Sequence, residues 1–555
     1  MAGELENIGQ CDHGVSSEYL IFGPPGSGKT TSLASQVRRA ADRFTPDRVL
    51  VTSFSRGAAE QLVGHDLPVR SDQIGTLHSR CFHALGRPSI AEVHVAEWNR
   101  ANRGLQLTAV RTQHSKLEGE NGAEEEPDGR GDVLLQALNR CRGVMAPPDA
   151  WPPEIQGFEC RWKDYKRYHG LLDFCDLIET AVHDLPAAPG LPAVIVADEA
   201  QDLNPLQSRL IANWGACCEY FVRAGDDDQT IYSFAGATPE TMLSPELPED
   251  HKVILEKSYR LPGAVRVFAE QLIHRVSRRQ EKEYRPRAEQ GAVHRISSGY
   301  RSPEYGILRS AMDHLSRGKS VMFLASCSYM LRPLIQVLRK HAVPFHNPYR
   351  RSVGFWNPLR SGNRGSAASR IRALLSVHPA SGERRLWTYA EFKSWSEWLI
   401  GTGILNEEVL RAAWPALSKQ NVTMDYLAKV FDPKALPSLQ NALARDYNRL
   451  LNWWRSAVHP DFRPRVQFPS DVAARQGPAT LVENPKVIVG TIHSVKGGQA
   501  DVVYLFPDLS SAGDANYRRS GTARDSVIRL FYVGATRARE TLYICGRSSS
   551  RAVSL

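Results

Sequence analysis

The residue pattern with the clearest chemistry lies near the amino terminus and begins at Gly23. After four residues it continues with Gly28, Lys29 and Thr30, which is the pattern of a phosphate-binding loop. Such glycines let backbone N–H groups turn toward phosphate oxygens, the lysine reaches the β- and γ-phosphates, and the threonine hydroxyl can ligate Mg²⁺. The nucleotide-binding residues expected from this pattern are Gly23, Pro24, Pro25, Gly26, Ser27, Gly28, Lys29, Thr30 and Thr31.

A pair of carboxylates follows an apolar run further along the chain. Residues 192–197 are apolar enough to predict a buried parallel strand, and Asp198 and Glu199 come directly after it. The carboxyl end of such a strand is where Mg²⁺ bound to a nucleotide needs a partner. We therefore assign Asp198, with Thr30, to the metal. Glu199 is the expected base that polarises the water attacking ATP.

Further segments resemble, in order, the motif series of superfamily 1 helicases of the UvrD/Rep/PcrA type. The run Gly-Asp-Asp-Asp-Gln-Thr-Ile-Tyr at 225–232 is close to the GDDDQSIY motif of that family, and Thr491–Gly497 resembles TIHSAKG. Together with the phosphate loop, the segments extend over nearly the whole chain. The segments that carry the resemblance are 51–60, 75–79, 172–177, 198–202, 225–232, 255–260, 491–497 and 530–538.

The resemblance implies roles for residues that surround the transferred phosphate. Gln229 is implied to sense the γ-phosphate and to link hydrolysis to DNA. Arg260 and Arg537 are implied to be arginine fingers from a second motor domain, across a cleft from Lys29. Such a finger can contribute ~10³–10⁵ in rate by neutralising charge on the phosphoryl group. The resemblance therefore implies a cleft that closes with ATP, opens after hydrolysis and drives a step along DNA.

The same resemblance implies the DNA-binding residues, with two departures from the family pattern. Phe54, His78, Phe234 and His493 are expected along the path of a single strand. Phe234 and the alanine after it stand where the family has Trp-Arg, so a stacking ring is kept while one contact to phosphate or DNA is missing. Gln499 replaces the glutamate implied to hold the ribose, and its amide can still form a hydrogen bond.

Other parts of the pattern leave questions open. Before Gly23, Gln10 is the only nearby candidate for an adenine-reading glutamine, so selectivity for adenine is inferred and not seen. Residues 325–328 lack an arginine often found there in the family. Residues 346–360 mix arginines with aromatic residues, which suits either contacts to DNA or a linker whose aromatics cover the core.

These segments predict an α/β protein with two RecA-like P-loop NTPase domains, each a parallel sheet with helices on both faces. Two insertions resemble in position the accessory domains of the family. The first has a Gly- and Glu-rich loop at 118–132, and the second is mainly helical, around 389–399 and 439–454. The expected domains are 1–87 with 171–249 (motor domain 1A), 88–170 (insertion 1B), 250–350 with 482–555 (motor domain 2A) and 351–481 (insertion 2B).

Composition places limits on the class of protein. The net charge is +9, a modest excess that fits a polyanionic partner without requiring one. The nine cysteines are scattered and form no CxxC pair, which argues against a zinc ribbon or a disulfide framework. Residues 1–10 are acidic and have no apolar core, so we expect no signal peptide there. No apolar run reaches ~18 residues, so we expect a cytoplasmic protein without a membrane partner.

Two functions remain in view at this point. The first is an ATP-dependent helicase that moves 3′ to 5′ on single-stranded DNA and unwinds tailed duplexes, with the direction taken only from the resemblance. The second is a DNA-stimulated NTPase or translocase that does not separate strands by itself. It would be a subunit that acts with a protein partner in a repair, recombination or phage-defence complex. A strand-separation assay distinguishes them.

Overall fold

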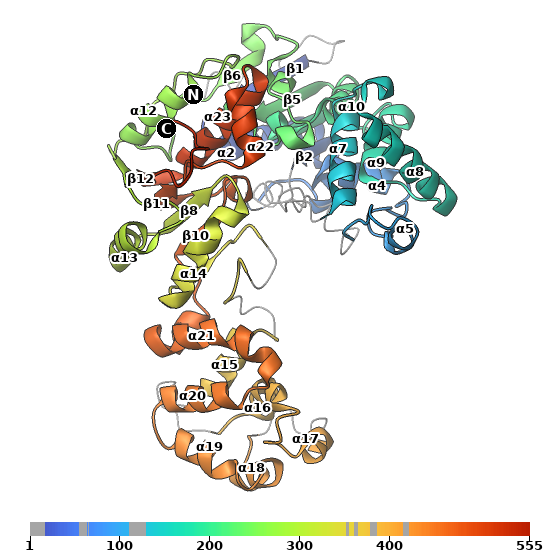
Figure 1. The fold of residues 1–555 in the computed structure, drawn as a ribbon. Helices are drawn as coiled ribbons and strands as arrows, with labels where there is room; N and C mark the ends of the chain where they lie inside the picture. The colour runs from blue at the N-terminus through green and yellow to red at the C-terminus, as the bar shows by residue number, and fades with distance from the viewer. Residues whose placement is uncertain are drawn as a thin grey trace. The chain divides into compact units, whose positions relative to one another are not determined.

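The computed structural model describes residues 17–54, 64, 66–109, 129–350, 355–359, 365–377, 386–413 and 421–555. Within these residues, the strands form two six-stranded sheets, and helices alternate with the strands along the chain (Figure 1). This confirms the predicted α/β class, with two parallel sheets of the RecA-like kind and additional helical regions. Gln10, the candidate adenine-reading residue, lies outside the described residues.

The first sheet brings the predicted site segments to one edge. Its strand order is β3-β2-β4-β5-β1-β6, and the pairs within it are parallel. The register places Phe22 opposite Gly225 and Ser53 opposite Asp198. The phosphate loop, the acidic pair and the aspartate run therefore begin at the same edge. The strands are β1 (Ser17–Phe22), β2 (Val49–Ser53), β3 (Ile74–Gly75), β4 (Val194–Asp198), β5 (Tyr220–Gly225) and β6 (Lys252–Ile254).

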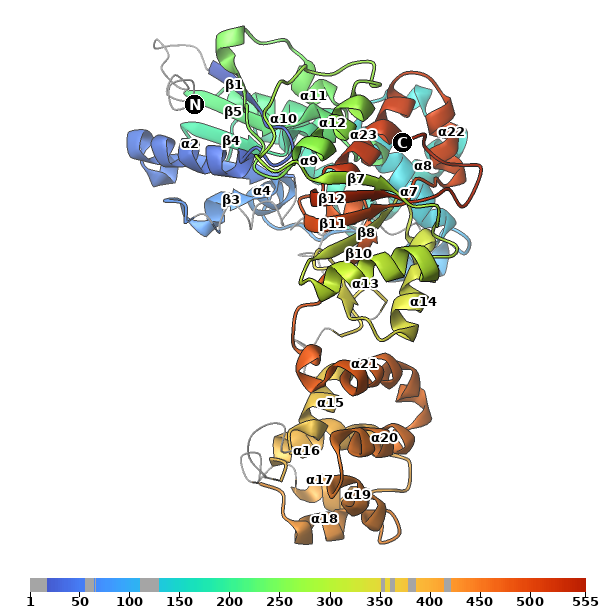
Figure 2. The same ribbon diagram turned by 90° about the vertical axis from the view of Figure 1, so that its left-hand side faces the viewer.

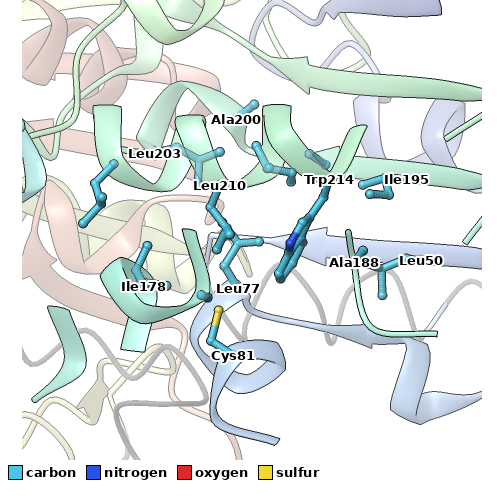
Figure 3. Close-up of a cluster of buried hydrophobic side chains, with 14 of the residues drawn as sticks. Leu50, Leu77, Cys81, Ile178, Ala188, Ile195, Ala200, Leu203, Leu210 and Trp214 are labelled. Carbon is cyan, nitrogen blue, oxygen red and sulfur yellow. The ribbon is translucent and has the colours of Figure 1, made fainter. Parts of the chain in front are cut away.

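Hydrophobic cores cover both faces of this sheet. Successive side chains of a strand point to opposite faces, and in β1 the residues Tyr19 and Ile21 join one cluster while Leu20 and Phe22 join the other. Figure 3 shows part of the cluster that contains Leu20 and Phe22, with Trp214 among its labelled side chains. The covering helices are α2 (Lys29–Phe44) in the first cluster and α4 (Leu77–Ala84), α9 (Phe174–Asp184) and α10 (Pro205–Gly215) in the second.

The second sheet has the strand order β7-β12-β11-β8-β10-β9. Its pairs β11–β12, β8–β10 and β9–β10 are parallel. Helices α12 (Gly263–Ile273) and α23 (Thr522–Ala535) lie side by side (Figure 2). The strands are β7 (Ala292–Arg295), β8 (Val321–Ala325), β9 (Phe345–His346), β10 (Val487–Thr491), β11 (Ala500–Leu505) and β12 (Ala538–Ile544).

The chain divides into two compact units. Unit 1 comprises Met1–His294, Ile492–Ile544 and Ser549–Leu555, and unit 2 comprises Arg295–Thr491 and Cys545–Ser548. Unit 1 holds the whole first sheet, including β6, which follows residue 249. It also holds β11, β12, α12 and α23. Every residue that we assigned to nucleotide, metal or DNA lies in unit 1.

The first insertion is helical and has an aromatic core of its own. Trp98, Phe158 and Trp162 are almost completely buried in it. The loop predicted for 118–132 ends earlier than expected because α7 begins at Arg130, whereas residues 110–128 lie outside the described part of the chain. The helices are α5 (Ala96–Ala101), α7 (Arg130–Gly143) and α8 (Pro153–His169).

The second insertion lies in unit 2 and is helical, as expected, with one correction. The single helical stretch expected around 439–454 is two helices, because Asp446 caps a new one by accepting the N–H of Arg449 at 2.9 Å. At the carboxyl end of the other predicted stretch, 397–399 form a 3₁₀ turn. The helices are α15 (Ala367–Leu375), α16 (Tyr389–Ser396), α17 (Glu407–Ala413), α18 (Met424–Val430), α19 (Leu436–Leu443), α20 (Tyr447–Ala457) and α21 (Arg463–Gln476).

The arginine- and aromatic-rich stretch 346–360 also belongs to unit 2. Its residues 351–354 and 360 lie outside the described residues. Trp356 is 8% exposed, with the guanidinium of Arg350 4.8 Å from its ring centre, whereas Phe355 is 42% exposed. The burial of Trp356 favours the linker interpretation for that ring.

Two searches of the described residues concern membranes and metals. No helix found there combines the length and the apolar character that a bilayer span requires. Within the same ranges, no group of three or more His, Cys, Asp and Glu side chains is arranged to hold a metal ion. A metal bound there would need other ligands, such as a hydroxyl group and phosphate oxygens.

Candidate functional site

The phosphate loop joins β1 to α2 and depends on two glycines. Gly26 and Gly28 have φ angles of +72° and +78°, which residues with a side chain rarely adopt. At Gly26 there is also no space, since a Cβ would lie 2.3 Å from the Cβ of Arg260. The N–H of Gly23 donates to the carbonyl of Gly225 at 2.9 Å and ties the loop to β5. The loop thus opens at the amino terminus of α2, which favours phosphate.

The Lys29 ammonium group faces the acidic residues at the end of β4. Its Nζ lies 3.3 Å from Oε1 of Glu199, and the Lys29 side chain is 11% exposed. Burial alone would lower the pKa of Lys29, but the negative charges of Glu199 and Asp198 outweigh it and raise the pKa above its ordinary value. Lys29 therefore remains a cation, as a partner for phosphate must be.

Glu199 occupies an unusual backbone conformation directly after β4. Its φ is +52°, a region that costs ~1–3 kcal/mol for a residue with a side chain and is found often at functional sites. Its Oε2 accepts from Nε2 of Gln201 at 2.5 Å and lies 3.6 Å from Nζ of Lys496. Burial would raise the pKa of Glu199, but Lys29 and Lys496 outweigh it and lower the pKa. Glu199 is thus ionised, as a general base requires.

Burial raises the pKa of two aspartates near Glu199. Asp198 is 3% exposed, and its Oδ1 accepts the N–H of Glu199 at 2.8 Å. Burial and the charge of Glu199 raise the pKa of Asp198. Burial also raises the pKa of Asp202 to about 7, although the Lys496 ammonium donates to its carboxylate. A divalent cation beside Asp198 would favour its ionised form, so the position suits a metal ligand.

Gln229 connects the turn after β5 with Arg537. Its Nε2 donates to Oδ2 of Asp226 at 2.7 Å, and its Oε1 accepts from Nη2 of Arg537 at 2.9 Å. Because a carboxylate only accepts and a guanidinium only donates, these two partners fix the orientation of the amide. Arg537 is 1% exposed and also donates to the carbonyls of Val533 and Gly498, at 2.8 and 3.3 Å. The structure thus brings two predicted residues, Gln229 and Arg537, into direct contact.

Arg260 lies beside the phosphate loop in unit 1. The N–H of Tyr259, the preceding residue, donates to the carbonyl of Gly26 at 2.8 Å. Nε of Arg260 donates to Oε1 of Gln499 at 3.0 Å. Arg260 and Gln499, which were assigned separately from the sequence, therefore form one pair near the loop.

Two families match the chain, one on each side of its middle part. The family described as AAA domain matches residues 12–235, and the family described as UvrD-like helicase C-terminal domain matches residues 486–545. Together they cover about half of the chain and include Lys29, Gln229 and Arg537. The chain belongs to the UvrD-like superfamily 1 helicase family. As a P-loop member of this family, it binds a nucleotide.

Curated relatives of this UvrD-like chain are distant in sequence. It is 22% identical over 261 residues to a putative ATP-dependent DNA helicase, YjcD, of Bacillus subtilis, a match that covers 43% of this chain and 34% of YjcD. The ATP-dependent DNA helicase PcrA of Staphylococcus epidermidis is 26% identical over 291 residues, 47% of this chain and 39% of PcrA. PcrA of Staphylococcus aureus is 24% identical over 360 residues, a match that covers 60% of this chain and 48% of that PcrA. The matches thus span a third to a half of these relatives.

In this UvrD-like chain, three of the four predicted DNA residues surround Tyr232. The ring centre of Tyr232 lies 5.1 Å from that of Phe54, 5.8 Å from Phe234 and 6.0 Å from His493. Phe234 and His493 are also in contact with each other, at 5.4 Å. Burial lowers the pKa of His493 to about 4, so its ring is neutral at pH 7. The cluster is half-buried and aromatic, which suits stacking on bases.

His78, the fourth predicted DNA residue, stands in the first turn of α4. The hydroxyl of Thr76 caps this helix by accepting the N–H of Ser79 at 3.2 Å. The ring centre of His78 lies 6.2 Å from that of Phe174, nearly perpendicular to it. His78 thus packs against a ring of α9, and its part in binding DNA stays a prediction.

Three residues of the site had no predicted role. Lys496 contacts Glu199 and Asp202. It lies inside the segment 491–497, one of those that carry the family resemblance, so the sequence could have pointed to it. Tyr259 is 57% exposed, with its ring 3.7 Å from the place of a Cβ at Gly28, so it can stack on a nucleotide base. Lys282 lies in a run of charged residues of the kind that usually faces solvent, so nothing in the sequence predicted that its side chain is buried.

Proposed function

We propose that the chain is an ATP-driven motor that moves 3′ to 5′ along single-stranded DNA and unwinds duplex DNA. The observation that carries the proposal is the buried contact of Gln229 with both Asp226 and Arg537. It joins the edge of the first sheet, where the phosphate loop lies, to the turn that follows helix α23. A change at the γ-phosphate would therefore alter the position of Arg537. This is the link that a motor needs between nucleotide state and movement.

ATP would bind with its phosphates against the backbone of the loop. Lys29 would contact the β- and γ-phosphates, while Thr30 and Asp198 would hold Mg²⁺. The bound metal would neutralise charge between the phosphates. Glu199, ionised beside its two lysines, would accept the proton of the attacking water.

Arg260 and Arg537 would neutralise charge on the transferred phosphoryl group. Arg260 starts close to this position, since its Cβ lies against Gly26 of the phosphate loop. Arg537 would act from the other side of Gln229. The UvrD-like relatives are named ATP-dependent DNA helicases, which supports DNA as the polymer that the motor follows.

The proposed path of the strand runs over the cluster of Tyr232, Phe54, Phe234 and His493. Stacking is tolerant of sequence because every base has a flat face, so binding would depend little on base sequence. The net charge of +9 would assist binding to phosphates and make affinity fall with added salt.

Strand separation on tailed duplexes tests the proposal. The full chain with ATP and Mg²⁺ should unwind a duplex with a 3′ single-stranded tail and leave one with a 5′ tail intact. Unwinding from the 5′ tail would contradict the direction. DNA-stimulated ATP turnover without unwinding from either tail would support the alternative, a motor subunit of a repair, recombination or phage-defence complex. A lack of any DNA-stimulated turnover would contradict both.

Replacing Phe234 with alanine should weaken the coupling between DNA and hydrolysis. Loss of one stacked base costs ~1–3 kcal/mol, so the concentration of oligo-dT that gives half-maximal ATPase stimulation should rise by about fivefold or more. Hydrolysis without DNA should change much less. Steady-state ATPase titrations at fixed salt measure both.

The matched control for Phe234→Ala is Tyr168→Ala. Tyr168 is 86% exposed on α8 and lies outside the proposed strand path. Its replacement should leave the DNA titration as in the wild type. If both variants, or neither, alter the titration, Phe234 is not a specific contact to the strand.

A further inference from the structure

The turn after β5 places three consecutive carboxylates in the protein interior. Asp226, Asp227 and Asp228 are each 0% exposed. Burying a charge is costly unless an opposite charge and hydrogen bonds compensate it. Two cations, Lys282 and Arg279, supply this compensation, although they lie more than 50 residues further along the chain.

Lys282 is enclosed by the three aspartates. Its side chain is 1% exposed, and Nζ lies 3.1 Å from Asp226, 2.5 Å from Asp227 and 3.0 Å from Asp228. Burial alone would lower the pKa of Lys282, but the aspartates outweigh it and hold the pKa above its ordinary value. Arg279 makes a two-pronged contact with Asp228 alone, at 2.9 and 2.7 Å. Of these two cations, Lys282 is therefore the one in contact with Asp226.

Asp226 is shared between Lys282 and Gln229. Its Oδ1 faces the ammonium group, and its Oδ2 accepts from Nε2 of Gln229 at 2.7 Å. The amide of Gln229 then presents its Oε1 to Arg537, 2.9 Å away. The ammonium of Lys282 and the backbone N–H of Asp228, 3.2 Å away, together hold Oδ1 of Asp226, and the carboxylate in turn sets the direction of the amide.

The segment that carries Lys282 is also bound to helix α23. The backbone N–H of Ser277 donates to Oδ2 of Asp525 at 3.1 Å, and Nη2 of Arg529 donates to the carbonyl of Arg278 at 2.7 Å. Asp525 and Arg529 both stand on α23, and Arg537 follows the end of that helix. Residues 277–282 thus connect the aspartate turn to α23 by a second route, independent of Gln229.

We propose that Lys282 is a positioning residue that, through Asp226, holds the Gln229 amide in the orientation that contacts Arg537. Lys282 thereby keeps the Gln229 amide in place relative to α23 during hydrolysis. The inference rests on the proposed motor function and names a residue on which that motor depends. A purely structural role, in which Lys282 only neutralises buried aspartates, makes a different prediction.

The double variant Lys282→Met/Asp227→Asn separates the two roles. It removes one positive and one negative charge, so the net charge of the cluster is unchanged, and it leaves Asp226 and Gln229 in place. Lys282→Met alone is a poor test, because an uncompensated buried carboxylate can prevent folding. Asp227→Asn alone is the matched control, since Asp227 contacts Lys282 and the N–H of Gln280 but has no described bond to Gln229.

The expected result for the double variant is a folded protein with a lower kcat and a nearly unchanged KM. Its melting temperature should lie above that of Lys282→Met, because one buried carboxylate fewer lacks a counter-charge, while kcat for DNA-stimulated ATP hydrolysis should fall about tenfold or more relative to Asp227→Asn. The KM for ATP should stay within about twofold, because the phosphate loop is untouched. Steady-state kinetics and thermal melting of the full chain measure these quantities.

A further variant tests the route through Gln229. Adding Gln229→Ala to the double variant should lower kcat little more, because both changes break the same link. The proposal is overturned if the folded double variant keeps the kcat of Asp227→Asn, or if the two effects multiply. If the wild-type chain itself shows no DNA-stimulated hydrolysis, the proposed function fails first, and this outcome is distinct from the other two.

Discussion

Lys29→Ala should lower the ATP turnover of the chain by about 10³-fold while DNA affinity changes little. The variant removes the cation that would compensate charge on the β- and γ-phosphates, and no other lysine is in described contact with the loop. The proposed DNA cluster around Tyr232 does not include Lys29. ATP hydrolysis with saturating oligo-dT and fluorescence anisotropy of a labelled oligonucleotide at one salt concentration measure the two effects.

The variant also changes the surroundings of Glu199. Glu199 loses the lysine 3.3 Å away and keeps Lys496 at 3.6 Å, so we expect the fold to survive. The matched control is Arg39→Ala, which removes an exposed cation from the same helix and should leave turnover intact. Equal loss of turnover and DNA binding in Lys29→Ala would mean that the fold has failed. Normal turnover would contradict the assignment of the phosphate site.

The sequence was sufficient to predict those residues whose positions follow from parallel strands. An apolar run followed by Gly23 and another followed by Asp198 place both at the carboxyl edge of one sheet, whatever lies between them. The register of β1 with β5 adds Gly225 to that edge. The family resemblance predicted Gln229 and Arg537 as site residues, and in the structure Nη2 of Arg537 donates to Oε1 of Gln229 at 2.9 Å.

The counter-charges of the site could not be predicted in this way. Lys282 lies in the run Arg278–Arg287, which is rich in charged residues and is typical of a solvated surface. It is buried only because three aspartates more than 50 residues earlier need compensation, and that need depends on the fold. For Arg260, the resemblance implied an arginine finger; its Cβ lies beside Gly26 of the phosphate loop, and its part in hydrolysis stays a prediction.

Local boundaries were uncertain for a different reason. The apolar spacing of 439–454 continues through Asp446, so periodicity alone predicts one helix. The break is set by a side chain that competes for a backbone N–H, as aspartate often does at the start of a helix. Similarly, the Gly-rich composition of 118–132 hid the start of α7, where Gly131 is needed because a Cβ would lie 2.3 Å from the carbonyl of Gln106.

Arg537→Ala should reduce kcat for DNA-stimulated ATP hydrolysis by about 10³-fold, with a much smaller change in the KM for ATP. Arg537 is 1% exposed, and its guanidinium donates to Gln229, Val533 and Gly498, so its loss removes both a transition-state charge and the link to Gln229. Arg537→Lys keeps the charge but cannot repeat this set of bonds, and it should recover less than a tenth of the activity. Steady-state kinetics with and without oligo-dT measure the effect.

Arg539→Ala is the control that separates this role from general loss of positive charge. Arg539 is two residues further along the same strand region, with a side chain 45% exposed and only a 3.9 Å contact to Asp501. Its replacement should leave kcat within about twofold of the wild type, because exposed ion pairs contribute little. A comparable loss of kcat in both variants would assign the effect to the fold around β12. A full kcat in Arg537→Ala would remove this arginine from the hydrolysis step, and the motor would then have to couple through Arg260 alone.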